Sequence, residues 1–215
     1  MGIAERKARD FQRREDEIVA AAVALIHERD IEMVTIAQIA ERAEIGKGTV
    51  YNHFRSKEEI VARILLAVRQ RIYRELKQEL VPGLDPVEVL RRIIEVYWRL
   101  HLEDPLFHLR MHSYCEKENF MARISPELAR ELNAAQGALL SLFREYIREG
   151  IGQGLFDIGD ADAMLWAAGA AIGGAIRMAL SASSRHQAVF QRESFREYLA
   201  QFIFKGLGWK GGEER

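Results

Sequence analysis

The segment from Lys47 to Phe54 carries a dense set of hydrogen-bonding side chains. If this segment is a helix, Val50 and Phe54 lie four residues apart and form its inward face. The other residues then point outward, small at the leading end and partly cationic; they are Lys47, Gly48, Thr49, Tyr51, Asn52 and His53. Such a surface suits a helix that closely approaches the bases and phosphates of DNA.

A second set of side chains could bind a metal ion. His108, His112 and Cys115 fall at positions i, i+4 and i+7 of a predicted helix, with His101 just upstream. Imidazole and thiolate are ligands of transition metals. Histidines on adjacent turns are also common without a metal, and no second cysteine completes a typical structural site. We therefore expect neither a metal nor a cofactor.

A short helix and a turn are predicted directly before the Lys47 segment. Thr35 and Gln38 form a capping box, in which the threonine hydroxyl accepts from a backbone N–H and the glutamine side chain reaches back. Apolar residues then recur at helical spacing from residue 36 to residue 43. In the turn at residues 44–46 we expect Gly46 to adopt a backbone conformation that a side chain would resist. This pattern predicts a helix-turn-helix.

Helices on both sides should complete this arrangement. Ser56 and Glu59 form a second capping box, so a new helix begins at Lys57. An earlier helix carries one apolar stripe that should cover the helix-turn-helix pair, formed by Phe11, Ile18, Ala22, Leu25 and Ile26. The segment that precedes it holds a basic cluster, consisting of Arg6, Lys7, Arg9, Arg13 and Arg14. This cluster either lies along phosphates or belongs to a solvated helix face and frayed terminus, because nearby acidic residues dilute its charge.

The rest of the chain is predicted to be helical as well. Helices are expected over residues 57–80, 86–103, 105–116, 126–150, 160–184 and 194–206, and no alternating strand pattern interrupts them. Asp85-Pro86 is a helix start, and Ser194 with Glu197 is a third capping box. The predicted fold is all-α, with a three-helix DNA-binding domain at residues 1–56 and a larger helical domain at residues 57–215.

Composition agrees with a soluble protein of this kind. The chain has 215 residues, 48% of them hydrophobic, and a formal net charge of −1, so DNA binding must depend on where charges lie. No uninterrupted apolar run approaches the roughly 20 residues of a membrane span. The single cysteine excludes an intrachain disulfide framework. We expect a cytoplasmic protein.

The run from Lys47 to Phe54, followed by Ser56-Lys57-Glu58-Glu59, resembles the signature of TetR-family transcriptional regulators. The resemblance implies that Thr35, Tyr51 and Lys57 contact phosphates. It also implies that Lys47, Gly48, Thr49, Asn52 and His53 face the DNA groove; Lys47 suits guanine and Asn52 suits adenine. The family usually has glycine where this chain has Glu44, and a small hydroxyl residue where it has Gly46. These departures bear on affinity or operator choice.

The predicted helix at residues 160–184 is unusually rich in small residues. Gly169, Gly173 and Gly174 interrupt a run of alanines, and each glycine inside a helix costs roughly 1 kcal/mol relative to alanine, so a packing reason is required. With the helix at residues 194–206, it resembles the family's four-helix dimer interface. Ordinary packing within one chain is the alternative. A dimer would set two recognition helices about 34 Å apart, as a palindromic site requires.

An apolar, aromatic-rich set lies between the predicted helix at residues 57–80 and the helices of the predicted dimer interface. From the residues alone it is ordinary core. The family resemblance implies instead a cavity for a small effector, in which a few polar groups orient a mostly apolar ligand. The candidate ligand-binding residues are Tyr97, Trp98, His101, Phe107, His108, Met111, Tyr114, Phe143, Trp166 and Arg177.

The function implied is that of a ligand-responsive repressor. It would bind a palindromic operator as a homodimer and be released by a small apolar or amphipathic effector. An enzyme is not expected, because no P-loop or G-x-S-x-G is present, and the glycines at 150, 152 and 154 are predicted to mark a helix end and loop. The alternative is a helical protein-interaction module that keeps the helix-turn-helix only as a scaffold.

Overall fold

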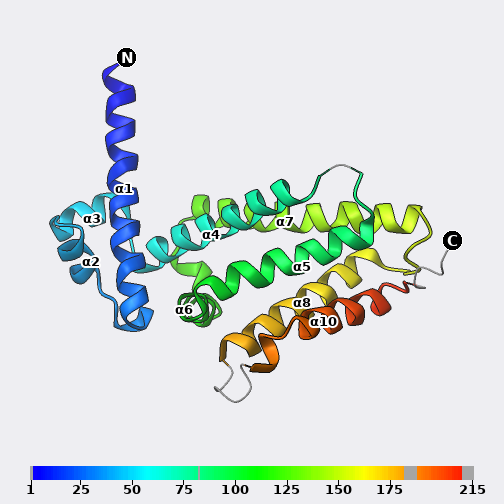
Figure 1. The fold of residues 1–215 in the computed structure, drawn as a ribbon. Coiled ribbons are helices and arrows are strands. Elements are labelled where there is room, and N and C mark those ends of the chain that lie inside the picture. Colours follow the sequence, from blue (N-terminus) through cyan, green and yellow to red (C-terminus); the bar gives the residue numbers. More distant parts are fainter. Residues whose placement is uncertain (1, 82, 182–187, 210–215) are drawn as a thin grey trace. The chain divides into compact units, whose positions relative to one another are not determined.

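The computed structural model describes residues 2–81, 83–181 and 188–209, and every regular element within these ranges is helical (Figure 1). The predicted all-α fold is therefore confirmed. The α-helices are α1 (Ile3–Glu28), α2 (Ile36–Arg42), α3 (Lys47–His53), α4 (Lys57–Glu79), α5 (Pro86–Glu103), α6 (Pro105–Cys115), α7 (Pro126–Gly152), α8 (Ala161–Ser181) and α10 (Glu193–Gly206). Two single 3-10 turns, η1 (Ile31–Met33) and η2 (Met121–Arg123), join them.

Most predicted helix starts are confirmed by their hydrogen bonds. The Thr35 hydroxyl accepts from the backbone N–H of Gln38, and the Gln38 side chain accepts from the Thr35 N–H, which completes the capping box of α2. The carboxylate of Asp85 accepts from the N–H groups of residues 87 and 88 at the start of α5. At α4, the Ser56 hydroxyl accepts from the N–H of Glu59. Local capping thus sets the boundaries.

The prediction for the last helix start was wrong. Helix α10 begins at Glu193, one residue before the expected capping residue, and Arg192 precedes it without a side-chain cap. Ser194 consequently lies inside the first turn of α10 and cannot act as its N-cap. The end predicted for the preceding helix, at residue 184, lies outside the described residues.

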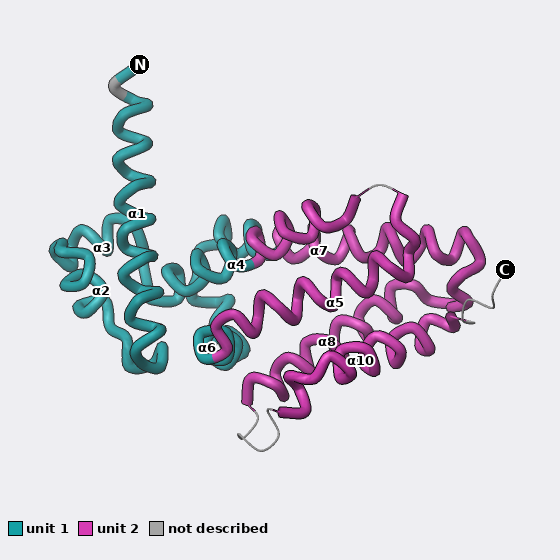
Figure 2. Tube along the Cα trace, viewed as in Figure 1, with its two compact units in different colours: residues 1–68, 106–134 teal, residues 69–105, 135–215 magenta. Residues whose placement is uncertain are grey.

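The chain forms two compact units (Figure 2). The first, called unit 1, contains residues 1–68 and 106–134; the second, unit 2, contains residues 69–105 and 135–215. Packing therefore groups α6 with the helix-turn-helix. The predicted boundary after residue 56 separates a DNA-binding domain from the rest of the chain. This assignment of functions to the two parts stays a prediction.

In unit 1, α1 packs on α2 and α2 packs on α3. Four of the five predicted stripe residues of α1 are buried: Ile18, Ala22, Leu25 and Ile26. Phe11 was wrongly assigned to this core, because its side chain is 49% exposed. Its ring lies 4.1 Å from the His53 ring at the last turn of α3, and the buried part of the apolar stripe ends before it.

In unit 2, α5, α8 and α10 pack on one another. Phe204 and Leu207 are fully buried at its centre. By length and composition alone, helix α8 could cross a membrane. Only 22% of its most apolar 18-residue stretch is buried inside the structure. One side of α8 therefore presents a large apolar surface that unit 2 itself does not cover.

The turn between α2 and α3 differs from the prediction. Glu44, with a φ of +55°, adopts the left-handed conformation that was expected of Gly46. Gly46 has φ −73° and ψ 149°, which any residue can adopt, and it serves as the N-cap of α3 without a side-chain hydrogen bond. A residue with a Cβ is strained at positive φ. The glutamate therefore stands where glycine would be favoured.

Replacing Glu44→Gly should relieve this backbone strain and so stabilise the protein. The expected gain is about 0.5–1 kcal/mol in the free energy of unfolding, because glycine adopts positive φ without a steric cost. Urea denaturation followed by circular dichroism, at one fixed protein concentration, measures it. Glu44→Ala is the matched control, since it removes the charge but keeps the Cβ. An equal gain in both variants would assign the effect to charge and contradict the prediction.

Candidate functional site

Helix α3 presents an open polar face. Lys47, Gly48, Tyr51 and Asn52 are exposed and Thr49 is half-buried, whereas Val50 and Phe54 are buried. The predicted inward and outward faces of α3 are thus confirmed. Tyr51 is 55% exposed, so its ring and hydroxyl both face solvent. No ion pair among the described residues uses Lys47, which leaves its charge available at the start of the helix.

Thr35 lies exposed at the beginning of α2. Besides accepting from the Gln38 N–H, its hydroxyl donates to the Gln38 side-chain oxygen over 3.1 Å. The free backbone N–H groups of a helix start favour an anion. Thr35 therefore occupies a position from which a helix start can meet a phosphate.

His53 differs from the other predicted groove-facing residues. Its ring lies 4.1 Å from the ring of Phe11, centroid to centroid, and its Nδ1 atom is buried with no hydrogen-bond partner among the described residues. The last turn of α3 is thereby joined to α1. His53 is half-buried and stands at the edge of the α3 face.

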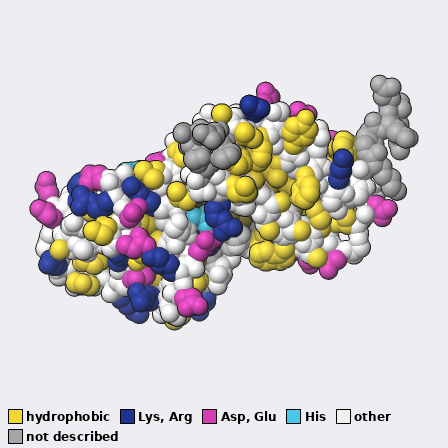
Figure 3. Space-filling model, turned by 90° about the horizontal axis from the view of Figure 1, so that it is seen from below, with side chains coloured by type: hydrophobic (Ala, Val, Ile, Leu, Met, Phe, Trp, Pro, Cys, Tyr) yellow, Lys and Arg dark blue, Asp and Glu magenta, His cyan; other side chains and the backbone are white. Residues whose placement is uncertain are grey.

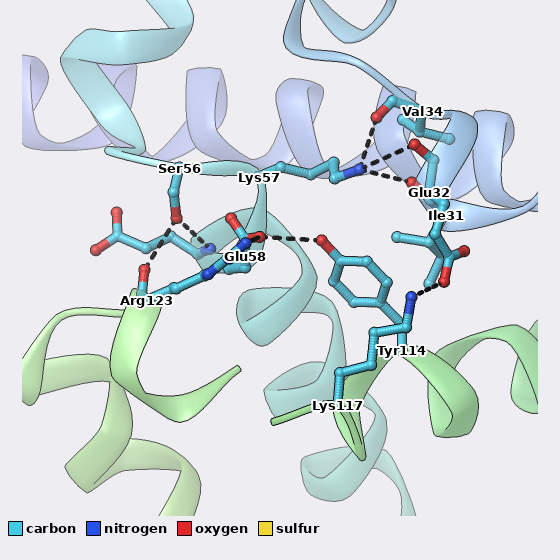
Figure 4. A network of polar contacts seen from close by, with 10 residues as sticks. Ile31, Glu32, Val34, Ser56, Lys57, Glu58, Tyr114, Lys117 and Arg123 are labelled. Atoms are coloured by element: carbon cyan, nitrogen blue, oxygen red, sulfur yellow. Dashed lines mark hydrogen bonds and ion pairs between the residues drawn. The ribbon is translucent and has the colours of Figure 1, made fainter. Parts of the chain in front are cut away.

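The ammonium of Lys57 binds the backbone around η1 (Figure 4). Its Nζ atom donates to the carbonyl oxygens of Ile31 at 2.8 Å, Val34 at 2.9 Å and Glu32 at 3.4 Å. An ammonium has three N–H donors, so these carbonyls can occupy all of them. Burial lowers the pKa of Lys57. The side chain therefore fastens the start of α4 to the segment that leads into α2.

Residues from α6 and the segment after it hold the same region of α4. The Tyr114 hydroxyl donates to the carboxylate of Glu58 over 3.1 Å, and Arg123 pairs with that carboxylate at 3.1 Å. Lys117 pairs with Glu32 next to η1. These five residues, Glu32, Glu58, Tyr114, Lys117 and Arg123, are called the α4 clamp. Figure 4 shows Tyr114 pointing toward Glu58 on the first turn of α4 and Lys117 pointing toward Glu32.

Backbone contacts reinforce the α4 clamp. The Ser56 hydroxyl donates to the Arg123 carbonyl over 3.1 Å, and the Ser125 N–H donates to Glu59 over 3.1 Å. Burial opposes ionisation of Glu58, but backbone hydrogen bonding and the Arg123 and Tyr114 side chains keep its pKa below the usual value. Burial, followed by the Glu58 charge, raises the pKa of Tyr114. The clamp is therefore charged at neutral pH on its acidic side.

The α4 clamp lines a cavity of about 320 Å³, together with Lys57, Glu118 and Phe120. The sequence did not predict this site, because its residues come from three distant segments with no common spacing. Only Lys57 and Tyr114 were candidate residues, and each was assigned to a different ligand. Three-dimensional packing alone brings them together.

The candidate ligand-binding residues fall into separate surroundings. In unit 2, the Tyr97 ring lies 5.7 Å from His101 and 5.9 Å from Phe143, and burial raises the pKa of Tyr97 to about 12. Trp98 is 3% exposed and lies 5.4 Å from Phe195, ring to ring. Its indole N–H has no acceptor among the described residues.

The other candidates lie elsewhere. Phe107, His108, Met111 and Tyr114 are on α6 in unit 1. Phe107 packs 5.0 Å from His27, ring to ring, and so contacts α1. Trp166 is 62% exposed on α8, and Arg177 is also exposed there. The predicted set therefore does not form a single group within either unit.

The histidine and cysteine set on α6 does not gather into a cluster. In the part of the chain that the structure describes, no group of three or more histidine, cysteine or acidic side chains is placed to hold a metal ion. The Nδ1 atom of His112 lies 3.1 Å from the carboxylate of Glu116, four residues later.

Comparison with known proteins finds a family match over the helix-turn-helix. Residues 18–64 match the family model described as bacterial regulatory proteins, tetR family. Over 77 residues the chain is 31% identical to the transcriptional repressor KstR2 of Mycolicibacterium smegmatis, an alignment that covers 36% of this chain and 38% of that protein. The chain thus spans less than half the length of this curated relative.

Solved structures share the fold over nearly the whole chain. RolR, solved with resorcinol, superposes with a TM-score of 0.66 at 24% identity, covering 96% of this chain and 93% of its own. FadR of Bacillus subtilis, solved with stearoyl-CoA, also gives 0.66, at 18% identity with 88% and 97% covered. The helix-turn-helix thus matches the TetR family of bacterial regulatory proteins in sequence, and the chain shares the fold of these solved structures.

Proposed function

We propose that this protein is a ligand-responsive repressor that binds operator DNA as a homodimer. The observation that carries the proposal is the open face of α3, which offers an ammonium, a phenol, an amide and a hydroxyl from a short, otherwise buried helix. A scaffold that only bound other proteins would not need this polar face at the position where the family model matches. The matched relatives are transcriptional regulators, and no enzymatic role is proposed.

In this proposal α3 enters the major groove. Lys47 and Asn52 contact base edges, where lysine suits guanine and asparagine suits adenine, and Gly48 and Thr49 allow close approach. Thr35 and Tyr51 bind phosphates on either side. Lys57 acts as a positioning residue instead, because its ammonium already binds the carbonyls around η1. His53 supports the edge of the face through Phe11.

The dimer interface proposed is the uncovered face of α8 and α10. A Cβ added to Gly169, Gly173 or Gly174 would meet no described residue within 4 Å, so packing within the described part of the chain does not require glycine there. The neighbouring apolar side chains are also strongly exposed; they are Trp166, Met178, Tyr198 and Phe202. Figure 3 shows hydrophobic side chains gathered over this part of unit 2. Another copy of the same face would cover them.

The effector is proposed to bind in unit 2 near Tyr97, Trp98, His101 and Phe143. The buried Trp98 N–H supports this placement, because a buried donor without an acceptor is costly and an acceptor atom of a ligand would satisfy it. Trp166 and Arg177 are exposed, so they are assigned to the proposed dimer interface instead of the effector site. The neighbours solved with resorcinol and stearoyl-CoA support an aromatic or acyl effector with polar groups.

The α4 clamp is proposed to pass the effector signal to the DNA-binding helices. Tyr114 of α6 holds Glu58 at the start of α4, and Lys117, just after α6, holds Glu32 beside η1. A movement of α6 would therefore change how α2 and α3 are held. The effector can release DNA only by binding the released arrangement more tightly than the DNA-bound one. A cytoplasmic location follows for a regulator of this kind.

Replacing Lys47→Ala should weaken binding to the operator and relax base preference, whereas Lys57→Met should weaken binding mainly by destabilising unit 1. The operator is first selected from a random duplex library with the full-length protein. For Lys47→Ala, affinity for this operator should fall about 10-fold or more, with a much smaller loss on a mixed-sequence duplex, because a contact to a base edge is removed. Fluorescence anisotropy on both duplexes measures these losses. An equal loss on the two duplexes would contradict the assignment.

Replacing Gly173→Glu should convert the dimer to monomers, because a charged side chain would stand inside the proposed interface. Analytical ultracentrifugation at micromolar protein measures the mass, and circular dichroism checks that the helices remain. Gly137→Glu, at an open position on α7, is the matched control and should leave the dimer intact. A dimer that survives Gly173→Glu would exclude this face.

Replacing Tyr114→Phe should leave effector binding intact but weaken its effect on DNA, because the hydrogen bond to Glu58 is lost. Aromatic and acyl compounds are screened by quenching of tryptophan fluorescence, with Trp98→Phe as the reference that loses the local signal. Operator affinity is then measured with and without each binding compound. The coupling proposal fails if every compound that binds leaves operator affinity unchanged.

A further inference from the structure

We propose that the first turns of α1 form a second DNA-binding surface, which holds backbone phosphates beside the groove that α3 occupies. The surface, called the α1 arm, consists of residues 2–14. The inference rests on the proposed function, because it requires that the protein binds DNA. It adds residues that the α3 face does not contain.

The α1 arm is a helix that stands free of the core. Helix α1 has 26 residues, and residues 4–13 are all exposed. At 1.5 Å per residue these ten positions add about 15 Å of helix. Figure 1 shows this part of α1 extending past α2 and α3. An isolated helix of this length is marginal in water. Residues 4–13 bury no apolar face that would stabilise their helical conformation.

The charge of the α1 arm is concentrated and partly unpaired. It carries five cationic residues against two acidic ones, in a chain whose formal net charge is −1. Arg13 and Arg14 pair with Glu17, one turn later. In contrast, no ion pair among the described residues uses Arg6, Lys7 or Arg9. Three cations are therefore available to an outside partner of negative charge.

The position of the α1 arm points to DNA as that partner. Phe11 lies 4.1 Å from His53, ring to ring, so the arm begins beside the last turn of α3. The major groove is about 12 Å wide. If α3 lies in this groove, the α1 arm, about 15 Å long and beside the end of α3, reaches the phosphates at the edge of the groove. Arginine and lysine in this position contact phosphates without reading sequence.

This contact predicts a specific salt dependence. Each neutralised phosphate contributes about 0.9 to the slope of log affinity against log salt concentration. Up to three cations in each of two protomers could contribute. The variant Arg6→Ala/Lys7→Ala/Arg9→Ala should therefore lose about 2 to 5 from the slope, on both the selected operator and a mixed-sequence duplex. Base preference should stay unchanged.

Two controls separate position from total charge. The variant Arg74→Ala/Lys77→Ala/Arg148→Ala removes three exposed cations outside the α1 arm and changes the net charge equally. It should keep the wild-type slope. The variant Arg6→Lys/Arg9→Lys keeps the charge of the arm and should also keep the slope. Circular dichroism confirms that each full-length variant is folded.

The outcomes distinguish this inference from the proposed function. If the wild type binds duplex DNA and the arm variant shows the same slope, the α1 arm is not a phosphate contact, while the proposed function stands. If both triple-alanine variants lose slope equally, the effect belongs to net charge and the inference is overturned. If the wild type binds no duplex, both fail together. A slope loss confined to the arm variant supports the inference.

Discussion

The start of α4 depends on the Lys57 ammonium more than on any other single group. Its three donors meet the carbonyls of Ile31, Glu32 and Val34, which follow the end of α1 and lead into α2. The bonds to Ile31 and Val34 are part-buried, and a buried carbonyl left without a partner costs about 1–3 kcal/mol. One side chain thus joins the start of α4 to the segment between α1 and α2, and the contacts of Glu58 in the α4 clamp are made on that same turn of α4.

Local chemistry explains why most of the fold was predictable. The Thr35 capping box, Asp85-Pro86 and the spacing of Ile18, Ala22 and Leu25 all act within a few residues, so the sequence pattern contains them. The faces of α3 were predictable for the same reason. The family signature added the expected role of those faces, which local chemistry does not contain.

The failures arise where the sequence pattern leaves more than one structural outcome open. Glu44 takes positive φ because the α2–α3 geometry demands it, and the nearby glycine concealed this from the sequence. Phe11 fits the apolar stripe by spacing, but the core ends before it. Lys57 and Tyr114 meet through the fold of unit 1, across 56 intervening positions that carry no common pattern. Ser194 showed that a capping motif can sit one residue inside the helix it should begin.

The open glycines of α8 couple folding to assembly if this face is the dimer interface. Three glycines in one helix lower its helical stability by about 1 kcal/mol each, and among the described residues none lies within 4 Å of a Cβ added at these positions. The compensation must then come from a partner, so helix formation in α8 and dimer formation draw on the same contacts. Dilution would act on this protein as a mild denaturant, and its melting temperature would depend on its concentration.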